Sequence, residues 1–210
     1  KAFISILGTN DYVECRHSFN GKVSEQPVKY AQEDLIKFFC SDFSENDEIR
    51  IFLTKEAKEK NWFDDGHKTK DGQPNSNKGL EQRIKALNLS CKVLSFDIKE
   101  GYNEQEIWDI FQNIYDTFRE EEEIIVDITH SFRSLPMLLI TLLNYAKQLK
   151  KIHVMGIYYA AFESLGPIPK VKEIPVEERI APILDLTQFS ELQDWTNATF
   201  DFINNGNIQK

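Results

Sequence analysis

The stretch from residue 124 to residue 159 decides the fold class; it reads IIVDITHSFRSLPMLLITLLNYAKQLKKIHVMGIYY. Residues 124–129, IIVDIT, are predicted to form a strand. Leucines then recur at helical spacing over 135–149, and 152–159 is a second apolar run. A strand, a helix and a strand in this order predict a βαβ unit with parallel strands.

The same alternation of strands and helices extends towards the N-terminus. The Asn20-Gly21 pair favours a tight hairpin turn between residues 12–16 and residues 22–23. Apolar runs and helical repeats predict further strands at 2–8, 47–54 and 91–98, and helices at 28–39, 80–87 and 107–118. We therefore predict an α/β, Rossmann-like fold with a mostly parallel sheet, helices on both faces and a small β-hairpin.

The pattern changes after residue 160. Glycine and proline residues between positions 166 and 182 mark irregular or hairpin structure, and apolar residues return at helical spacing from residue 187. Asn205-Gly206 can end this last helix. We predict a main domain over 1–165, followed by a linker or hairpin and a C-terminal helical extension over 166–210.

Composition and charge exclude several classes of protein. The 210 residues are 41% hydrophobic and carry a net charge of -9, which disfavours a protein that coats long nucleic acids. The longest apolar stretches, such as 138–143, are far shorter than the ~20 residues of a transmembrane helix. Three widely spaced cysteines without a CxxC pattern favour reduced thiols in a cytoplasmic protein, with no metal site and no cofactor. The acidic run 120–123 is interpreted as a solvated turn.

Two loops follow predicted strands at the carboxyl edge of the sheet, where open α/β sheets bind ligands. Loop 8–12 contains neither the GxGxxG nor the GxxxxGK[ST] pattern, so no recognisable dinucleotide or nucleoside triphosphate site is encoded. Loop 127–134 brings hydroxyls, an imidazole, a guanidinium and backbone N–H groups to a helix start, which favours an anion site. The alternative is structural: a serine caps the helix, Asp127 satisfies a neighbouring loop, and Arg133 pairs with a carboxylate.

Both loops carry a family resemblance. Residues 127–136, DITHSFRSLP, resemble a signature of the CRISPR-associated Rossmann-fold (CARF) family. Residues 4–12, ISILGTNDY, are similar to that family's first motif in its Csx-type members. The order and separation of the two motifs also fit, and by element order the resemblance covers residues 1–160.

This resemblance implies a sensor in type III CRISPR antiviral defence. The expected protein is a homodimer that binds a cyclic tetra- or hexa-adenylate across its twofold axis and controls a fused effector. The expected sensing domain is 1–165, and 166–210 would lead towards an effector that is missing from the chain. By motif, the expected ligand-binding residues are Thr9, Asn10, Thr129, His130, Ser131 and Arg133.

Two other functions stay open. Some members of the family cleave their own cyclic ligand without a metal, and His130 or Ser131 would then be catalytic. A structural dimerisation module with a degenerate pocket is the third interpretation. No arginine is followed by four to six residues and a histidine, and no HxE with PCxxC occurs, so neither a HEPN ribonuclease nor a deaminase signature is present.

Most of the aromatic residues singled out in the sequence are predicted to have structural roles. Trp62, Trp108 and Trp195 are predicted to be packing residues, and His17 is assigned to the hairpin. Tyr158 and Tyr159, at the end of a predicted strand, could stack an adenine.

Overall fold

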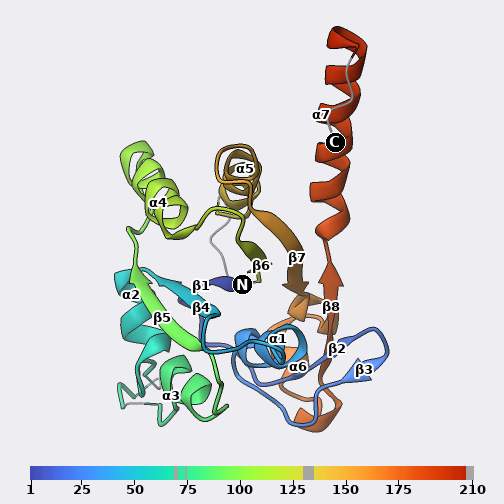
Figure 1. The fold of residues 1–210 in the computed structure, drawn as a ribbon. Helices are drawn as coiled ribbons and strands as arrows, with labels where there is room; N and C mark the ends of the chain where they lie inside the picture. Colours follow the sequence, from blue (N-terminus) through green and yellow to red (C-terminus); the bar gives the residue numbers. More distant parts are fainter. Residues whose placement is uncertain (69–70, 74, 130–134, 207–210) are drawn as a thin grey trace.

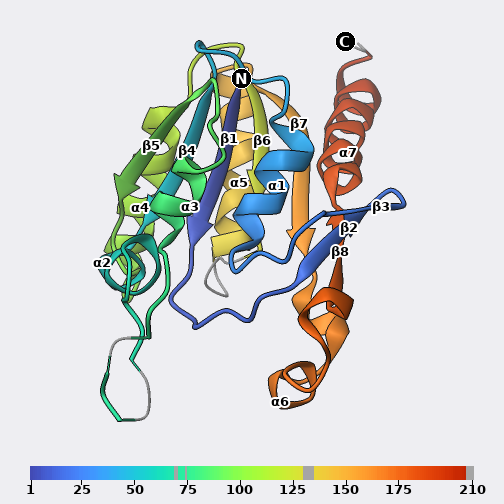
Figure 2. The ribbon, with the colours of Figure 1, turned by 90° about the horizontal axis from the view of Figure 1, so that it is seen from below.

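The computed structural model of the chain describes residues 1–68, 71–73, 75–129 and 135–206. Its strands are β1 (Ala2–Leu7), β2 (Arg16–Phe19), β3 (Lys22–Val23), β4 (Glu48–Leu53), β5 (Lys92–Asp97), β6 (Glu123–Asp127), β7 (His153–Ala160) and β8 (Ile180–Asp185). They form one sheet in the order β3-β2-β8-β7-β6-β1-β4-β5. The neighbours β5, β4, β1, β6 and β7 are all parallel, with their carboxyl ends at one edge (Figure 2). The predicted mostly parallel sheet is confirmed.

Helices cover both faces of this sheet. The α-helices are α1 (Ala31–Phe39), α2 (Lys55–Ala57), α3 (Leu80–Lys85), α4 (Glu104–Thr117), α5 (Leu135–Leu149), α6 (Ile168–Val171) and α7 (Thr187–Asn205). Shorter turns are the π-helical η1 (Lys58–Trp62) and the 3-10 segments η2 (Phe162–Leu165) and η3 (Val176–Glu178). Figure 1 shows α1 and α3 on one face and α4 and α5 on the other, so the predicted Rossmann-like α/β arrangement is confirmed.

The central strand β1 explains why its sequence is almost wholly apolar. Every residue of β1 is buried, because β4 and β6 flank it and helices cover both of its faces. Phe3 and Leu7 join the core beneath α1, whereas Ile4 and Ile6 join the core beneath α4 and α5. Ser5 points to the α1 side by the same two-residue alternation.

Two elements differ from the sequence prediction. β8 was not predicted, because Pro182 lies inside it and proline usually argues against a strand. Pro182 is in register with Ser18 of β2, and its carbonyl oxygen accepts the backbone N–H of Ala161, just after β7, at 2.9 Å. The strand therefore tolerates a residue that has no N–H to donate. The hairpin turn at Asn20-Gly21 is confirmed with positive φ angles of 48° and 78°, but its first strand is β2 and not residues 12–16.

The C-terminal helix α7 extends away from the sheet (Figure 1). It ends at Gly206, which has a left-handed φ of 63°, so the predicted terminator is confirmed. The predicted division at residue 165 stays a prediction, although β8 belongs to the same sheet as β1. No helix within the described ranges is long and apolar enough to cross a membrane.

The tryptophans correct another prediction. Trp62 is buried as expected, but Trp108 is 66% exposed and Trp195 is 72% exposed. Trp108 lies beside the apolar face of α4, where it lines a hollow between α4 and α5, and Trp195 lies on α7. Neither is a core residue.

A buried ion-pair network closes the amino edge of the sheet. Arg50 of β4 is 1% exposed, and its guanidinium donates to Glu48 at 2.8 Å and to both carboxylate oxygens of Glu122 at 3.0 and 2.6 Å. Arg119 also donates to Glu48. Glu120 and Glu121 are exposed in the turn, as predicted for run 120–123, but Glu122 is buried, so the solvated-turn interpretation holds for only part of the run.

This network predicts a large and specific loss of stability. Arg50→Met would remove the buried guanidinium that pairs with Glu48 and Glu122 and leave both buried carboxylates with Arg119 alone, and breaking a buried ion pair typically costs about 3–5 kcal/mol. Arg119→Met is the matched control, because Arg119 is 58% exposed and such ion pairs contribute less than about 1 kcal/mol. Urea unfolding of both variants measures the difference. Similar free energies of unfolding for the two variants would contradict the assigned role.

Candidate functional site

The two motif loops begin at the same edge of the sheet. β1 and β6 are adjacent and parallel, with Ser5 in register with Asp127. Asn10, from the loop after β1, and Thr129, from the loop after β6, line one cavity of about 400 Å³. Thr9 is half-buried and does not line this cavity. The volume lies in the range of small-molecule sites.

The remaining predicted residues, His130, Ser131 and Arg133, lie outside the described residues. Their roles stay predictions from the motif.

Asp127 organises the end of β6. Its carboxylate accepts a hydrogen bond from Ser5 Oγ at 2.7 Å and from the Thr129 backbone N–H at 2.8 Å. Gln32 of α1 donates to Ser5 Oγ at 3.1 Å. Burial raises the pKa of Asp127, and the hydrogen bonds from Thr129 and Ser5 oppose that shift. The structural interpretation of Asp127, that it satisfies a neighbouring loop, is confirmed.

Thr129 links this loop to the next strand. Its Oγ1 accepts the backbone N–H of Ala160, at the end of β7, at 2.9 Å. The first residues after β6 are therefore tied to β1 through Asp127 and to β7 through Thr129.

The loop after β1 is held by a residue that sequence reasoning missed. Asn61 is fully buried, and its Nδ2 donates to the carbonyl oxygens of Gly8 and Asn10, each at 2.9 Å. Its Oδ1 accepts from Tyr30 at 3.4 Å and lies 3.0 Å from Nε2 of His67. Asn61 belongs to the π-helical turn η1, a feature that often occurs at functional sites.

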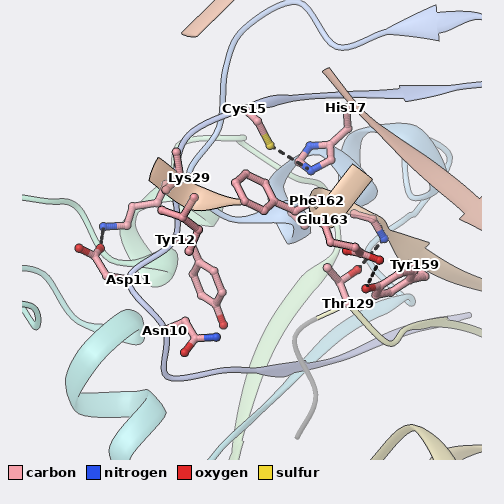
Figure 3. Close-up of a pocket in the computed structure, with 14 residues that line it drawn as sticks. Asn10, Asp11, Tyr12, Cys15, His17, Lys29, Thr129, Tyr159, Phe162 and Glu163 are labelled. Carbon is pink, nitrogen blue, oxygen red and sulfur yellow. Dashed lines mark hydrogen bonds and ion pairs between the residues drawn. The ribbon is translucent and has the colours of Figure 1, made fainter. Parts of the chain in front are cut away.

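The cavity combines charged and apolar walls (Figure 3). Lys29 Nζ donates to Asp11 at 2.8 Å, and Tyr159 donates to Glu163 at 2.8 Å. Burial raises the pKa of Asp11, but the hydrogen bond and charge of Lys29 outweigh burial and leave this pKa below its usual value. Val13, Ala31, Phe162 and Ile168 supply apolar surface.

The adjacent tyrosines of β7 have different roles. Tyr158 is buried and stacks on Phe39, with ring centroids 3.6 Å apart and planes at 6°. It belongs to the core, so its predicted role as a stacking surface for adenine is wrong. Tyr159 lines the cavity. Successive side chains of a strand point to opposite faces, which allows only one of the two to reach the cavity.

His17 lies in β2 and so in the predicted hairpin, but the sequence did not indicate its buried partners. It is buried, with Nδ1 2.9 Å from Asp34 Oδ2 and Nε2 3.6 Å from Cys15 Sγ. Burial lowers the pKa of His17, but the hydrogen bonds with Asp34 and Cys15 outweigh burial and raise it to about 9. Within the described ranges, no group of three or more His, Cys, Asp or Glu side chains is arranged to hold a metal ion.

Known proteins resemble this chain over most of its length. The family model of the CARF domain of the CRISPR system endoribonuclease Csx1 matches residues 2–163. A CRISPR-associated protein of Methanocaldococcus jannaschii is 26% identical over 189 residues. That match covers 86% of this chain but only 28% of the relative, so the chain spans less than a third of that protein's length.

The raised pKa of His17 predicts a pH-dependent stability. A histidine with a pKa of about 9 when folded and 6.5 when unfolded stabilises the fold fully below pH 6.5. This contribution is lost as the pH rises through about 9. At ~1.4 kcal/mol per pKa unit, the loss is about 3 kcal/mol in the free energy of unfolding. Urea unfolding at about pH 6 and pH 10 measures it.

Two variants isolate the contribution of His17. His17→Gln should remove most of the pH-dependent loss, whereas His153→Gln, at an exposed position of β7, should retain it. If His17→Gln shows the same loss as the wild-type protein, another group is responsible.

Proposed function

This chain belongs to the CARF-domain family of the CRISPR system endoribonuclease Csx1, and from this premise we propose that it binds a cyclic oligoadenylate at the cavity between its two motif loops. The observation that carries the proposal is that Asn10 and Thr129, both expected from the motifs, line the same cavity. The family match by itself supports a sensor domain of a CRISPR system.

The chemistry of the cavity favours an adenine base over a phosphate group. Lys29 already neutralises Asp11 and so offers little free charge to a phosphate, whereas the carboxylates of Asp11 and Glu163 can accept hydrogen bonds from the amino group of adenine. Phe162 and Tyr159 add aromatic surface on which a base can stack. We infer that a base of the ring enters the cavity and that the phosphates stay outside it.

The phosphates then need other donors. His130, Ser131 and Arg133 follow Thr129 in the sequence and offer the groups that phosphates bind. A net charge of -9 makes a local site for a compact polyanion more suitable than a surface for long nucleic acids. In a homodimer, a twofold axis would supply each donor twice to a cyclic ligand. Control of a fused effector is part of the same proposal.

Calorimetric titration tests this function. The purified chain is titrated with cyclic tetra-adenylate and with cyclic hexa-adenylate, and we expect one ring bound per two chains. Asn10→Ala should weaken binding by about 5- to 150-fold, because a hydrogen bond to a ligand contributes ~0.5–1.5 kcal/mol and is lost in both subunits. Asn46→Ala, in an exposed loop far along the sequence from both motifs, is the matched control.

Two further readouts complete the test. Analysis of the nucleotide after titration shows whether the ring stays closed or becomes linear, which separates a sensor from a ring nuclease. If neither ring binds to the folded protein, or if Asn10→Ala binds both as tightly as the wild type, the cavity is not the site.

A further inference from the structure

Three side chains outside the proposed ligand contacts lie in line at one end of the cavity. Cys15 Sγ is 3.6 Å from Nε2 of His17, and Nδ1 of the same ring is 2.9 Å from Oδ2 of Asp34. Cys15 and His17 both line the cavity, and Figure 3 shows the thiol facing the imidazole ring. A thiol, an imidazole and a carboxylate are thus aligned beside a space that a small molecule can enter.

The backbone holds this alignment. Cys15 and His17 are two residues apart on extended chain, so their side chains fall on the same side of it. The N–H and C=O groups of Cys15 both pair with Val28, and His17 pairs with Ala181 of β8. Asp34 comes from α1 and is fully buried. The three groups therefore have fixed positions in the folded protein.

The carboxylate of Asp34 determines where the protons lie. An ionised carboxylate only accepts hydrogen bonds, so Nδ1 of His17 must carry a hydrogen. In the neutral ring, Nε2 then presents its lone pair to the thiol of Cys15. Lys37 Nζ forms an ion pair with the other oxygen of Asp34 at 3.5 Å. The pKa of His17 is raised to about 9, so near neutral pH Nε2 holds a proton directed at Cys15 Sγ, and the positive ring favours the anionic, nucleophilic form of the sulfur.

We propose that Cys15 is a nucleophilic thiol that forms covalent adducts with small Michael acceptors entering the cavity, with His17 as base and Asp34 as a positioning residue. With the thiol proton held on Nε2 of His17, the anionic sulfur bonds to the β-carbon of the α,β-unsaturated carbonyl compound. The electron pair of the carbon–carbon double bond moves to the α-carbon, which takes the proton from Nε2. The thioether contains every atom of both reactants, and no other reactant is needed.

The other two cysteines provide an internal contrast. Cys40 and Cys91 are buried in the hydrophobic core on the face of the sheet that α1 covers, and neither lines the cavity. Burial raises the pKa of both thiols. Cys15 is also buried, at 3% exposure, but it lines the cavity and lies beside His17. Cys40 and Cys91 line no part of this cavity, so we expect their thiols to react slowly.

An adduct on Cys15 also has a consequence for the proposed function. It would occupy the cavity that Asn10 and Thr129 line, and it would therefore exclude a cyclic oligoadenylate. This consequence rests on the proposed function, whereas the reaction at Cys15 does not.

Acrylamide, a small uncharged Michael acceptor, tests the reaction on the whole chain without any nucleotide. Peptide mass spectrometry gives the rate of adduct formation at each cysteine. We expect Cys15 to react at least about tenfold faster than Cys40 and Cys91, a modest effect for a positioned general base. His17→Gln and Asp34→Asn should each slow the reaction at Cys15 about tenfold. His153→Gln should leave it unchanged.

The pattern over three cysteines separates loss of the base from a loosened fold. A variant that only opens the structure would speed the reaction at Cys40 and Cys91, whereas loss of the base slows Cys15 and leaves the other two unchanged. Equal rates at all three cysteines of the folded protein, or a Cys15 rate that His17→Gln does not change, would overturn the proposal. Fast reaction at Cys15 without binding of either cyclic oligoadenylate supports this proposal and contradicts only the proposed function.

Discussion

One buried carboxylate, that of Asp127, holds the candidate site together. Ser5 and the Thr129 backbone donate to it, Gln32 donates to Ser5, and Ala160 donates to Thr129. These hydrogen bonds join β1, β6, β7 and α1 at the edge where the cavity opens. Loss of one partner would leave a buried polar group unsatisfied, at a cost of about 1–3 kcal/mol. The position of the cavity walls therefore depends on the carboxylate of Asp127, a polar group whose burial in an apolar core is unfavourable without these hydrogen bonds.

The role of Asp127 changes how its motif is understood. The structural interpretation holds for Asp127 itself, whose oxygens are occupied by protein donors. A buried carboxylate is expensive to desolvate, and its pKa is raised by burial. Its value lies in fixing the direction of the chain after β6, so that Thr129 reaches the cavity. Loop 127–134 thus begins with a residue that supports the structure, and the proposed ligand contacts follow it.

Much of the fold could be predicted from the sequence, because apolar periodicity reports local packing. β1 and β6 are continuous apolar runs since both of their faces are covered, and the family predicted from residues 127–136 is confirmed by the match over 2–163. β8 was missed for two reasons. Its pairing with β2 joins residues far apart in the sequence, and Pro182 within it argues against a strand. The cavity walls were missed for the same reason: no local pattern brings Lys29 to Asp11.

Helix α1 shows what the local patterns could not convey. Its residues Gln32, Glu33 and Asp34 are consecutive, polar and buried, which an ordinary amphipathic surface helix would not tolerate. Each has a different partner: Gln32 bonds to Ser5, Glu33 accepts the backbone N–H of Tyr30 and faces Arg83, and Asp34 orients His17. The first turn of α1 thus supports both the Asp127 network and the Cys15 cluster. Because one turn of α1 holds both, a shift of α1 would move the Asp127 hydrogen bonds and the Cys15–His17–Asp34 cluster together.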